Sequence, residues 1–281
     1  MPEVTVIIPA KDESAVISDL VKRIRRDWTD AELIVVDDGS SDDTAELARK
    51  AGAQVISHPE SLGNGAAVKA GARVASGEVL VFLDGDGQHD PADIPRLLEQ
   101  LDNGYDMAIG ARSTGSHANV ARLAANGIYN VVASWMTGHR IPDLTSGFRA
   151  VRADKFRSFL YLLPNGFSYP TTITMAFMRS GYPVEFVDIA AYKRKGKSHI
   201  RPIRDGIRFM VIIFKIATLY APLKLYLPAS ALFFLTGLIY YGYTYLAYGR
   251  FTNMTLLLLS AAVIVFLIGL ISEQITALFY K

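Results

Sequence analysis

Two carboxylates stand one residue apart at the end of an apolar run. The segment Val81–Pro91 reads VFLDGDGQHDP and contains Asp84 and Asp86. Such a pair can converge on one hard cation, because Mg²⁺ prefers oxygen ligands and keeps further positions for water and substrate phosphates. The intervening glycines permit a tight turn, and Gln88 can add a carbonyl oxygen. The spacing predicts a seat for a metal-bound diphosphate; a simple Asp-Gly turn is the alternative.

Acidic and polar residues also follow two other apolar runs. One run leads into DDGSSDDT, where Asp37 or Asp38 can accept hydrogen bonds from a nucleobase or a ribose hydroxyl. Another ends in PAKDE, where Pro9 and Ala10 offer backbone groups to a base and Glu13 offers a carboxylate to a ribose. Turns and helix caps favour the same residue types, so a structural role is the alternative.

A glycine-rich segment, SLGNGAAVKAG, opens an expected helix. Gly63 and Gly65 stand at its start, where exposed backbone N–H groups can face a diphosphate. The segment is not a P-loop, because the pattern G-x-x-x-x-G-K-[ST] is absent from it. No G-x-G-x-x-G follows the first apolar run, which argues against a dinucleotide oxidoreductase.

Two arginines can hold an anionic group. Arg112 ends the run IGAR, and Arg149 ends DLTSGFR. A guanidinium presents parallel N–H donors that match the geometry of a phosphate. An internal ion pair is the alternative for each arginine. Asp143 begins DLTSGFR and can orient either a sugar hydroxyl or one of the arginines.

The surrounding pattern predicts the elements that position these residues. Short, β-branched apolar runs alternate with amphipathic stretches, which is typical of an α/β fold with a mostly parallel sheet. Ligands bind at the carboxyl ends of the strands in such sheets, where the polar clusters lie. The expected strands are Val4–Pro9, Leu33–Asp37, Gln54–Ser57 and Val79–Leu83. The expected helices are Ser14–Arg26, Asp42–Ala51, Asn64–Ala75 and Pro91–Leu101.

The composition changes after Asp188. Residues 193–222 are rich in Lys and Arg and carry apolar residues at helical spacing, which indicates helices lying on an anionic membrane surface. A solvated basic face is the alternative. Leu225–Tyr248 and Met254–Ser272 are almost free of charge, and each is long enough to cross a hydrocarbon core of about 30 Å. A short connector joins them, so we expect a transmembrane hairpin rather than two buried helices of a soluble core.

In their order and spacing, these motifs resemble family 2 glycosyltransferases of the dolichol-phosphate mannose synthase and bacterial polyprenyl-phosphate glycosyltransferase type. The motifs are VIIPAKDE, VVDDGSSDDT, LGNGAAVKAG, FLDGDGQHDP, IGAR, DLTSGFR and YKRKGKSHIRPIRD. The resemblance implies a Rossmann-like GT-A catalytic domain in residues 1–192, interfacial amphipathic helices in residues 193–222 and two transmembrane helices in residues 223–281.

The resemblance also implies the activity, an inverting and metal-dependent hexosyltransferase that uses Mg²⁺ or Mn²⁺. The sugar would move from a UDP- or GDP-sugar to the phosphate of a polyprenyl lipid, undecaprenyl or dolichyl phosphate. The expected metal ligands are Asp84, Asp86 and Gln88. The expected donor-binding residues are Pro9, Ala10, Glu13, Asp37, Asp38, Gly63, Gly65 and Asp84. The expected acceptor-phosphate residues are Arg112, Ser146, Arg149, Lys193, Arg194, Lys195 and Ser198.

A phosphate acceptor makes a general base unnecessary, because its second pKa is near 6 and it is already a dianion near pH 7. We expect Asp86, Arg112 and Asp143 to be the catalytic residues. A transferase acting on a lipid alcohol, such as ceramide or diacylglycerol, is the alternative and would need a carboxylate base, for which Asp143 is the candidate. A membrane-anchored nucleotide-binding protein is the non-enzymatic alternative.

The expected location is the cytoplasmic membrane of a prokaryote, with the catalytic domain and both termini in the cytoplasm. The start of the chain has no basic segment followed by an apolar one, and the basic run precedes the first span. The expected partners are the nucleotide sugar, the polyprenyl phosphate and the bilayer, without nucleic acid; a homo-oligomer is compatible with the sequence. The chain has no cysteine, which excludes a cysteine-based zinc site.

Overall fold

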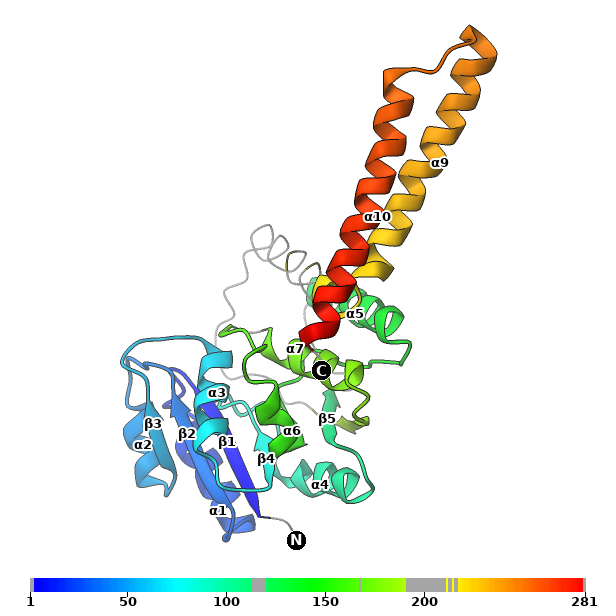
Figure 1. The fold of residues 1–281 in the computed structure, drawn as a ribbon. Helices are drawn as coiled ribbons and strands as arrows, with labels where there is room; N and C mark the ends of the chain where they lie inside the picture. Colours follow the sequence, from blue (N-terminus) through cyan, green and yellow to red (C-terminus); the bar gives the residue numbers. More distant parts are fainter. Residues whose placement is uncertain are drawn as a thin grey trace. The chain divides into compact units, whose positions relative to one another are not determined.

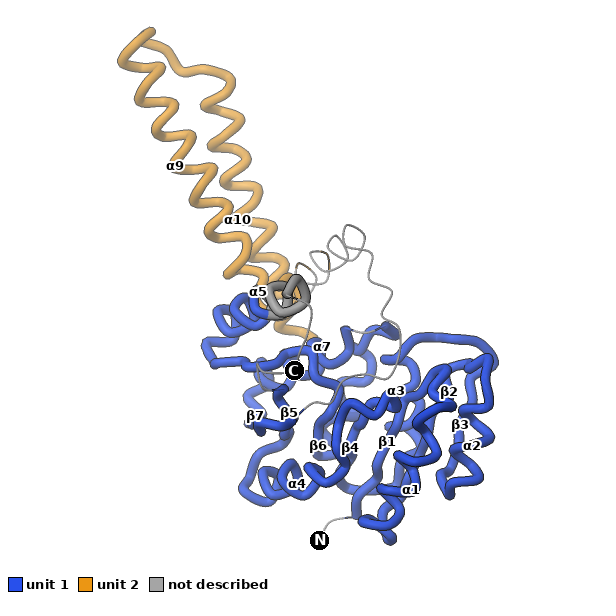
Figure 2. Tube along the Cα trace, turned by 180° about the vertical axis from the view of Figure 1, so that it is seen from behind, with its two compact units in different colours: residues 1–201 blue, residues 202–281 orange. Residues whose placement is uncertain are grey.

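The computed structural model describes residues 3–112, 120–166, 168–190, 211, 214 and 217–279. The chain divides into two compact units, residues 1–201 and residues 202–281, which Figure 2 colours separately. Most of the expected interfacial segment, residues 193–222, lies outside the described residues.

The first unit is built on a seven-stranded sheet with the strand order β3-β2-β1-β4-β6-β5-β7 (Figure 1). Neighbouring strands pair in parallel except at β6, which is antiparallel to both β4 and β5. The strands are β1 Val4–Ala10, β2 Glu32–Asp37, β3 Gln54–Ser57, β4 Val79–Phe82, β5 Met107–Arg112, β6 Arg149–Arg152 and β7 Val184–Ile189. The predicted α/β fold with a mostly parallel sheet is confirmed.

Helices cover both faces of this sheet. The helices of the first unit are α1 Ile17–Asp27, α2 Thr44–Lys50, α3 Asn64–Val74, the 3₁₀ turn η1 Pro91–Asp93, α4 Ile94–Asp102, α5 Val120–Thr137, α6 Ala153–Ser158 and α7 Tyr169–Arg179. Buried apolar side chains of α1 and α4 pack in one cluster with Val6 and Ile8 of β1. On the opposite face, Gly71 of α3 lies so close to the sheet that a Cβ there would be 2.5 Å from Ile7 Cγ2. Burial on both faces explains why the central strands are continuous apolar runs.

Two predicted helices begin later than expected, for one shared reason. The Asp42 carboxylate accepts hydrogen bonds from the N–H groups of Ser14 and Thr44, both at 3.1 Å. The Thr44 hydroxyl accepts the Glu13 N–H at 2.9 Å. These bonds tie residues 13–16 to the start of α2 as a turn, so α1 starts at Ile17 and α2 at Thr44.

The second unit contains two long apolar helices, α9 Pro222–Tyr248 and α10 Asn253–Phe279, which lie side by side in both views (Figures 1 and 2). Both are long and apolar enough to cross a membrane by length and composition. The second helix extends further than Met254–Ser272 and includes Glu273. That carboxylate accepts the Leu223 N–H at 3.2 Å, which satisfies a donor in the first turn of α9.

Small residues form the seam between these two helices. Gly237 and Gly269 lie in it because a Cβ on either would come within 2.9 Å or 2.7 Å of the facing helix. The Ser230 hydroxyl donates to the Ala262 carbonyl across the seam at 2.8 Å. The buried seam residues recur at every seventh position: Ser230, Gly237 and Thr244 on α9, and Thr255, Ala262, Gly269 and Thr276 on α10. This spacing is typical of closely packed helix pairs.

Candidate active site

The carboxyl ends of β1, β2, β4 and β5 bring the predicted site residues to one edge of the sheet. Strand register places Ala10 beside Asp37. The Asp38 N–H donates to the Ala10 carbonyl at 2.9 Å, and the Gly85 N–H donates to the Pro9 carbonyl at 3.2 Å. The two carbonyls expected to face a nucleobase therefore each accept a hydrogen bond from the backbone of a neighbouring loop.

Asp84 and Asp86 lie just beyond β4, on a turn shaped by the backbone of β1. A Cβ on Gly85 would lie 3.1 Å from the Pro9 carbonyl oxygen, so glycine permits this close approach. Asp86 accepts hydrogen bonds from the Gln88 N–H at 3.1 Å and from its side-chain amide at 2.7 Å. In this arrangement Gln88 orients Asp86 through an N–H group, and a role as a carbonyl ligand to a cation would require the amide to turn.

The electrostatics of the pair suit a divalent cation. Burial, together with the charge of Asp86, raises the pKa of Asp84 to about 6. Two carboxylates that repel each other are relieved when a cation binds between them. Within the described residues, no group of three His, Asp or Glu side chains forms a metal cage. A Mg²⁺ ion held by one or two carboxylates leaves its other positions to water and phosphate oxygens.

The Asp38 side chain organises a loop. Its Oδ1 is hydrogen-bonded to His58 Nδ1 at 2.8 Å and to the Leu62 N–H at 2.9 Å. Its Oδ2 accepts the Ser61 hydroxyl at 2.8 Å and the Gly63 N–H at 2.9 Å. Four hydrogen bonds fill the acceptor positions of a carboxylate. The expected contact between this side chain and a donor nucleotide is therefore not supported.

Asp37 is better placed for a nucleotide than Asp38. It is buried, and among the described residues its carboxylate accepts one hydrogen bond, from the Ser40 N–H to Oδ1 at 3.3 Å. Acceptor capacity remains for a nucleobase N–H or a ribose hydroxyl. Glu13 lies in the neighbouring loop, which the bond from its N–H to Thr44 holds in place.

Gly63 and Gly65 have a packing role that the sequence did not indicate. A Cβ on Gly63, whose φ is +103°, would lie 2.5 Å from the Asn165 carbonyl oxygen, and one on Gly65 would lie 2.9 Å from the Gly166 carbonyl oxygen. The Ala66 N–H donates to the Asn165 carbonyl at 3.1 Å. The 164–166 segment thus packs directly on the start of α3 and takes one of the N–H groups that were expected to face a diphosphate.

Arg112 and Asp143 form a partly buried ion pair. Arg112 Nε lies 2.7 Å from Asp143 Oδ2, and its Nη2 donates to Asp143 Oδ1 at 3.0 Å and to the Thr145 hydroxyl at 2.7 Å. Asp143 also accepts the Arg112 N–H, the Thr145 N–H and the Thr145 hydroxyl. Burial opposes ionisation of Asp143, but the hydrogen bonds and charge of Arg112 outweigh it and hold its pKa below the usual range. Asp143 therefore orients Arg112, one of the two roles predicted for it.

The expected phosphate contact at Arg149 is not supported, because its side chain is fully buried. Its guanidinium donates to the Ser146 carbonyl, to the Pro170 carbonyl at 3.2 Å and to the Thr174 hydroxyl at 3.2 Å. Ser146 is also fully buried, and its hydroxyl has no hydrogen-bond partner among the described residues. Lys193, Arg194, Lys195 and Ser198 lie outside the described residues.

Four supporting residues were missed from the sequence. Thr145 bonds to both members of the Arg112–Asp143 pair, and its N–H donates to Asp143 two residues earlier, as in the turns that Asp favours. Asn64 bonds to Asp84. Gly147 and His58 carried no local signal: the first packs on Asp84 and the second on Asp38, and both contacts join distant segments.

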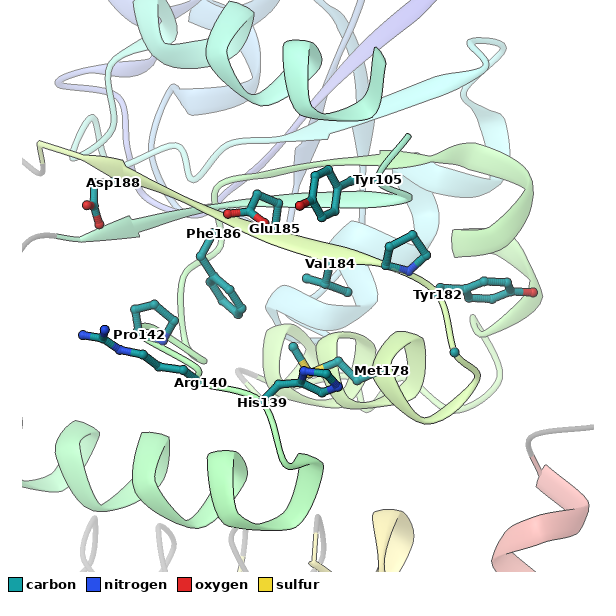
Figure 3. A pocket seen from close by; sticks show the side chains of 12 residues that line it. Tyr105, His139, Arg140, Pro142, Met178, Tyr182, Val184, Glu185, Phe186 and Asp188 are labelled. Atoms are coloured by element: carbon teal, nitrogen blue, oxygen red, sulfur yellow. The ribbon is translucent and has the colours of Figure 1, made fainter. Parts of the chain in front are cut away.

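A separate cavity of about 690 Å³ lies along the outer edge of β7 (Figure 3). Its lining comes from β7, from the segment after α5 and from the end of α7, and includes Phe186, Pro142 and Met178. None of the predicted site residues lines this cavity. The chemistry-bearing side chains gather at the carboxyl edge of the sheet instead.

Two family models match the chain. The model described as glycosyl transferase family 2 matches residues 5–160, which includes the segments after β1, β2, β4 and β5. The model described as GtrB C-terminal hairpin matches residues 221–278, which correspond to α9 and α10. The two matches together cover most of both compact units.

Named relatives share much of this length. Glycosyltransferase AglJ of Haloferax volcanii is 30% identical over 227 residues, 78% of this chain and 74% of that protein. The dolichyl-phosphate hexose transferase of the same organism is 31% identical over 216 residues, 76% of this chain and 93% of that protein. The undecaprenyl-phosphate 4-deoxy-4-formamido-L-arabinose transferase of Salmonella choleraesuis is 32% identical over 163 residues, 53% of this chain and 49% of that protein.

Solved structures share the fold. The crystal structure of glucosyl-3-phosphoglycerate synthase from Mycobacterium tuberculosis, in complex with Mn²⁺, UDP and phosphoglyceric acid, superposes with a TM-score of 0.62. The match covers 77% of this chain and 78% of that chain at 23% sequence identity. At this identity the likeness establishes the architecture of the sheet and its helices.

Proposed function

Because the chain belongs to glycosyl transferase family 2, we propose that it transfers a sugar from a nucleoside-diphosphate donor to the phosphate of a polyprenyl lipid. It is a glycosyltransferase with a GT-A-type α/β domain and an apolar C-terminal hairpin. Relatives named dolichyl-phosphate hexose transferase and undecaprenyl-phosphate formamido-arabinose transferase support the lipid-phosphate acceptor.

The state of Asp143 is the observation that carries this proposal. A lipid alcohol has to lose a proton as it attacks, so its enzyme needs a carboxylate with a proton-accepting lone pair. Asp143 was the candidate, but Arg112 and Thr145 occupy its oxygens and its pKa is lowered. A phosphate monoester attacks as an anion and needs only to be held. The Arg112–Asp143 pair therefore favours a phosphate acceptor over ceramide or diacylglycerol.

The donor would bind at the turn after β4. Asp84 and Asp86 would hold a Mg²⁺ or Mn²⁺ ion, and the Mn²⁺ and UDP bound by the structurally similar synthase support this assignment. When bound, such an ion supplies Lewis-acid stabilisation of the departing nucleoside diphosphate. Asp37 would accept a hydrogen bond from the nucleoside, since Asp38 is already engaged with its loop.

The acceptor would bind beside Arg112. Its guanidinium is already oriented by Asp143 and Thr145, so little side-chain freedom would be lost when it meets a phosphate. Lys193, Arg194, Lys195 and Ser198 would add positive charge, and the lipid would remain in the bilayer.

The hairpin would keep the enzyme at the membrane that contains its acceptor. Both apolar helices are long enough to span, and the hairpin model matches them. We place both termini and the catalytic unit in the cytoplasm of a prokaryote, because basic residues precede the first span and cytoplasmic flanks are enriched in Lys and Arg.

The test is transfer by the purified full-length protein in nanodiscs. A panel of UDP- and GDP-sugars is offered with Mn²⁺ and either undecaprenyl phosphate or diacylglycerol, and products are separated by thin-layer chromatography. We expect a lipid-linked sugar from the phosphate acceptor with at least one donor, and none from diacylglycerol. Excess chelator and Asp86→Asn should each remove nearly all turnover, whereas Asp93→Asn on the η1 turn should not.

Turnover of diacylglycerol with no product from undecaprenyl phosphate would overturn the acceptor assignment. Full activity in chelator would overturn the metal assignment while leaving the acceptor assignment intact. Binding of nucleotide without transfer by any donor would support the non-enzymatic alternative.

A further inference from the structure

Arg149 is a buried cation without an ion pair among the described residues. Its side chain is 0% exposed. Its hydrogen-bond acceptors are neutral: the carbonyls of Ser146 and Pro170, the hydroxyl of Thr174 and the thioether of Met107. Its Nε–H has no acceptor among the described residues, and its guanidinium carbon lies 5.8 Å from the centroid of the Tyr169 ring. Burying a charge in this way is costly, and a neutral side chain of similar length would avoid the cost.

The guanidinium joins two segments that are distant in sequence. Nη2 holds the Ser146 carbonyl, in the turn that precedes β6. Nη1 holds the Pro170 carbonyl and the Thr174 hydroxyl, in the first turns of α7. The Thr174 hydroxyl itself donates to the Pro170 carbonyl at 2.8 Å, so the α7 side of the clamp is cross-bonded.

The turn held by Arg149 encloses Asp84. A Cβ on Gly147 would lie 2.8 Å from Asp84 Oδ1, so the turn packs directly against this carboxylate. The backbone of Arg149 pairs with Phe82, two residues before Asp84, and thereby fixes the turn against the end of β4. Asp84 is also among the carboxylates whose charge acts on the Arg149 guanidinium. The cation therefore lies in the protein interior, close enough to Asp84 for the two charges to interact.

We propose that Arg149 is a positioning residue of the donor site, which holds the Ser146–Gly147 turn against Asp84 and directs positive potential from the interior toward the bound diphosphate. This inference rests on the proposed function in one respect, the placement of the donor's metal and diphosphate at Asp84 and Asp86. Arg149 itself touches neither the substrate nor the metal ligands by hydrogen bond. Its effect would be electrostatic and geometric.

The two effects can be separated, because a positive charge repels a cation and attracts an anion. Removing the charge should leave Mn²⁺ binding unchanged or stronger, while UDP or GDP binding in the presence of Mn²⁺ should weaken. A loosened site that merely lost its shape should bind both ligands more weakly. At an effective dielectric constant of about 20, a unit charge about 10 Å from a bound phosphate charge changes the binding constant of the nucleotide by on the order of tenfold.

The experiment uses Arg149→Met, Arg149→Gln and Arg149→Lys in the full-length protein at pH 8. Free Mn²⁺ is measured by electron paramagnetic resonance, and UDP or GDP binding by calorimetry at saturating Mn²⁺. We expect the Met and Gln variants to bind nucleotide about tenfold more weakly without loss of Mn²⁺ affinity, and the Lys variant to lie within about threefold of wild type for both. The Gln variant keeps a donor for the Ser146 carbonyl and so preserves the turn if the Met variant does not fold.

Arg157 provides the matched control. Its guanidinium also donates to backbone carbonyls, those of Ala72 and Ala75 at 3.0 Å and 2.6 Å, but in α3 and just beyond it. Arg157→Met should lower the melting temperature and leave both binding constants unchanged. Unchanged nucleotide affinity in folded Arg149→Met and Arg149→Gln would overturn the proposal, and so would parallel loss of Mn²⁺ and nucleotide binding.

If neither neutral variant folds, Thr174→Val removes one acceptor of the guanidinium and keeps every charge. Because the positive charge and the bond to the Ser146 carbonyl remain, the proposal then expects nucleotide and Mn²⁺ affinities within about threefold of wild type. A tenfold loss of nucleotide affinity in this variant would overturn it. A wild-type protein that binds neither Mn²⁺ nor nucleotide would instead refute the proposed function, so the two failures are distinguishable.

Discussion

The Asp37–Asp38 pair offers a decisive test of which acidic residue serves the fold and which serves the donor. In Asp38→Asn, one of the two carboxylate oxygens becomes an NH₂ group that cannot accept hydrogen bonds. Asp38 accepts four hydrogen bonds, from His58, Ser61, Leu62 and Gly63, and two of these donors lose their acceptor in the variant. Each hydrogen bond to a charged group contributes about 1.5 to 3 kcal/mol, so we expect a loss of about 3 to 6 kcal/mol.

The assay is thermal unfolding of the full-length protein in nanodiscs, followed by tryptophan fluorescence. For a unit of about 200 residues, 1 kcal/mol shifts the melting temperature by roughly 2 to 4 °C, so Asp38→Asn should melt about 6 to 24 °C lower. Asp37→Asn is the matched control: it should melt near wild type and raise the donor KM about tenfold or more. A melting temperature of Asp38→Asn within 1 °C of wild type, or equal destabilisation by Asp37→Asn, would refute the reasoning.

The same carboxylate predicts how stability depends on pH. Burial opposes ionisation of Asp38, but its bonds with His58, Ser61 and two backbone N–H groups outweigh this and lower its pKa. A lowered pKa contributes stability that is present above the ordinary carboxyl pKa near 4 and is lost as the pH falls below it. Acid should therefore destabilise Asp38→Asn less than wild type between about pH 5 and pH 3.

Three further outcomes are expected. Asp143→Asn should lower kcat with undecaprenyl phosphate about 10- to 100-fold, because Arg112 loses its charged anchor, and should gain no turnover of diacylglycerol; a wild-type kcat would contradict the orienting role. Mn²⁺ affinity, measured by electron paramagnetic resonance, should fall below about pH 6, because the raised pKa of Asp84 makes a proton compete with the metal; a constant affinity from pH 5 to pH 7.5 would contradict it. Gly237→Ala should lower the stability of the hairpin by about 1 to 3 kcal/mol in thermal unfolding followed by far-UV circular dichroism, because its Cβ would meet Leu259. Gly242→Ala, with open space around it, should not, and equal effects of the two substitutions would contradict close packing of the helices at Gly237.

The sequence predicted where the site lies because the signal is local. Strands of a parallel sheet end at one edge, so polar residues after Val79–Leu83 and Leu33–Asp37 had to become neighbours once the α/β pattern was recognised. The same locality explains why helix existence was predicted better than helix starts. The start of α1 depends on Asp42, which lies 25 residues after Ile17 along the chain.

The assignments that changed are those that depend on distant segments. Asp37 and Asp38 are alike in sequence. The segment 58–63 packs against Asp38, and its hydrogen bonds occupy the acceptor positions of that carboxylate and not those of Asp37. Arg149 could bind a ligand in isolation, but the antiparallel insertion of β6 and the packing of α7 bury it. In sequence, Gly63 and Gly65 look like part of a phosphate-binding loop, but in the structure the 164–166 segment packs against them.

The length of the C-terminal hairpin has a consequence for membrane depth. Each helix has 27 residues, which at 1.5 Å per residue gives about 40 Å, roughly 10 Å more than a hydrocarbon core. Counting about 20 residues back from Tyr248 places the inner edge of the core near Pro228. Residues 222–227 and the Glu273 carboxylate would then lie at the level of the lipid headgroups, where water and phosphate are present. The surplus length would make the hairpin a spacer as well as an anchor, because its inner turns would extend into the layer that holds the phosphate of the proposed lipid acceptor.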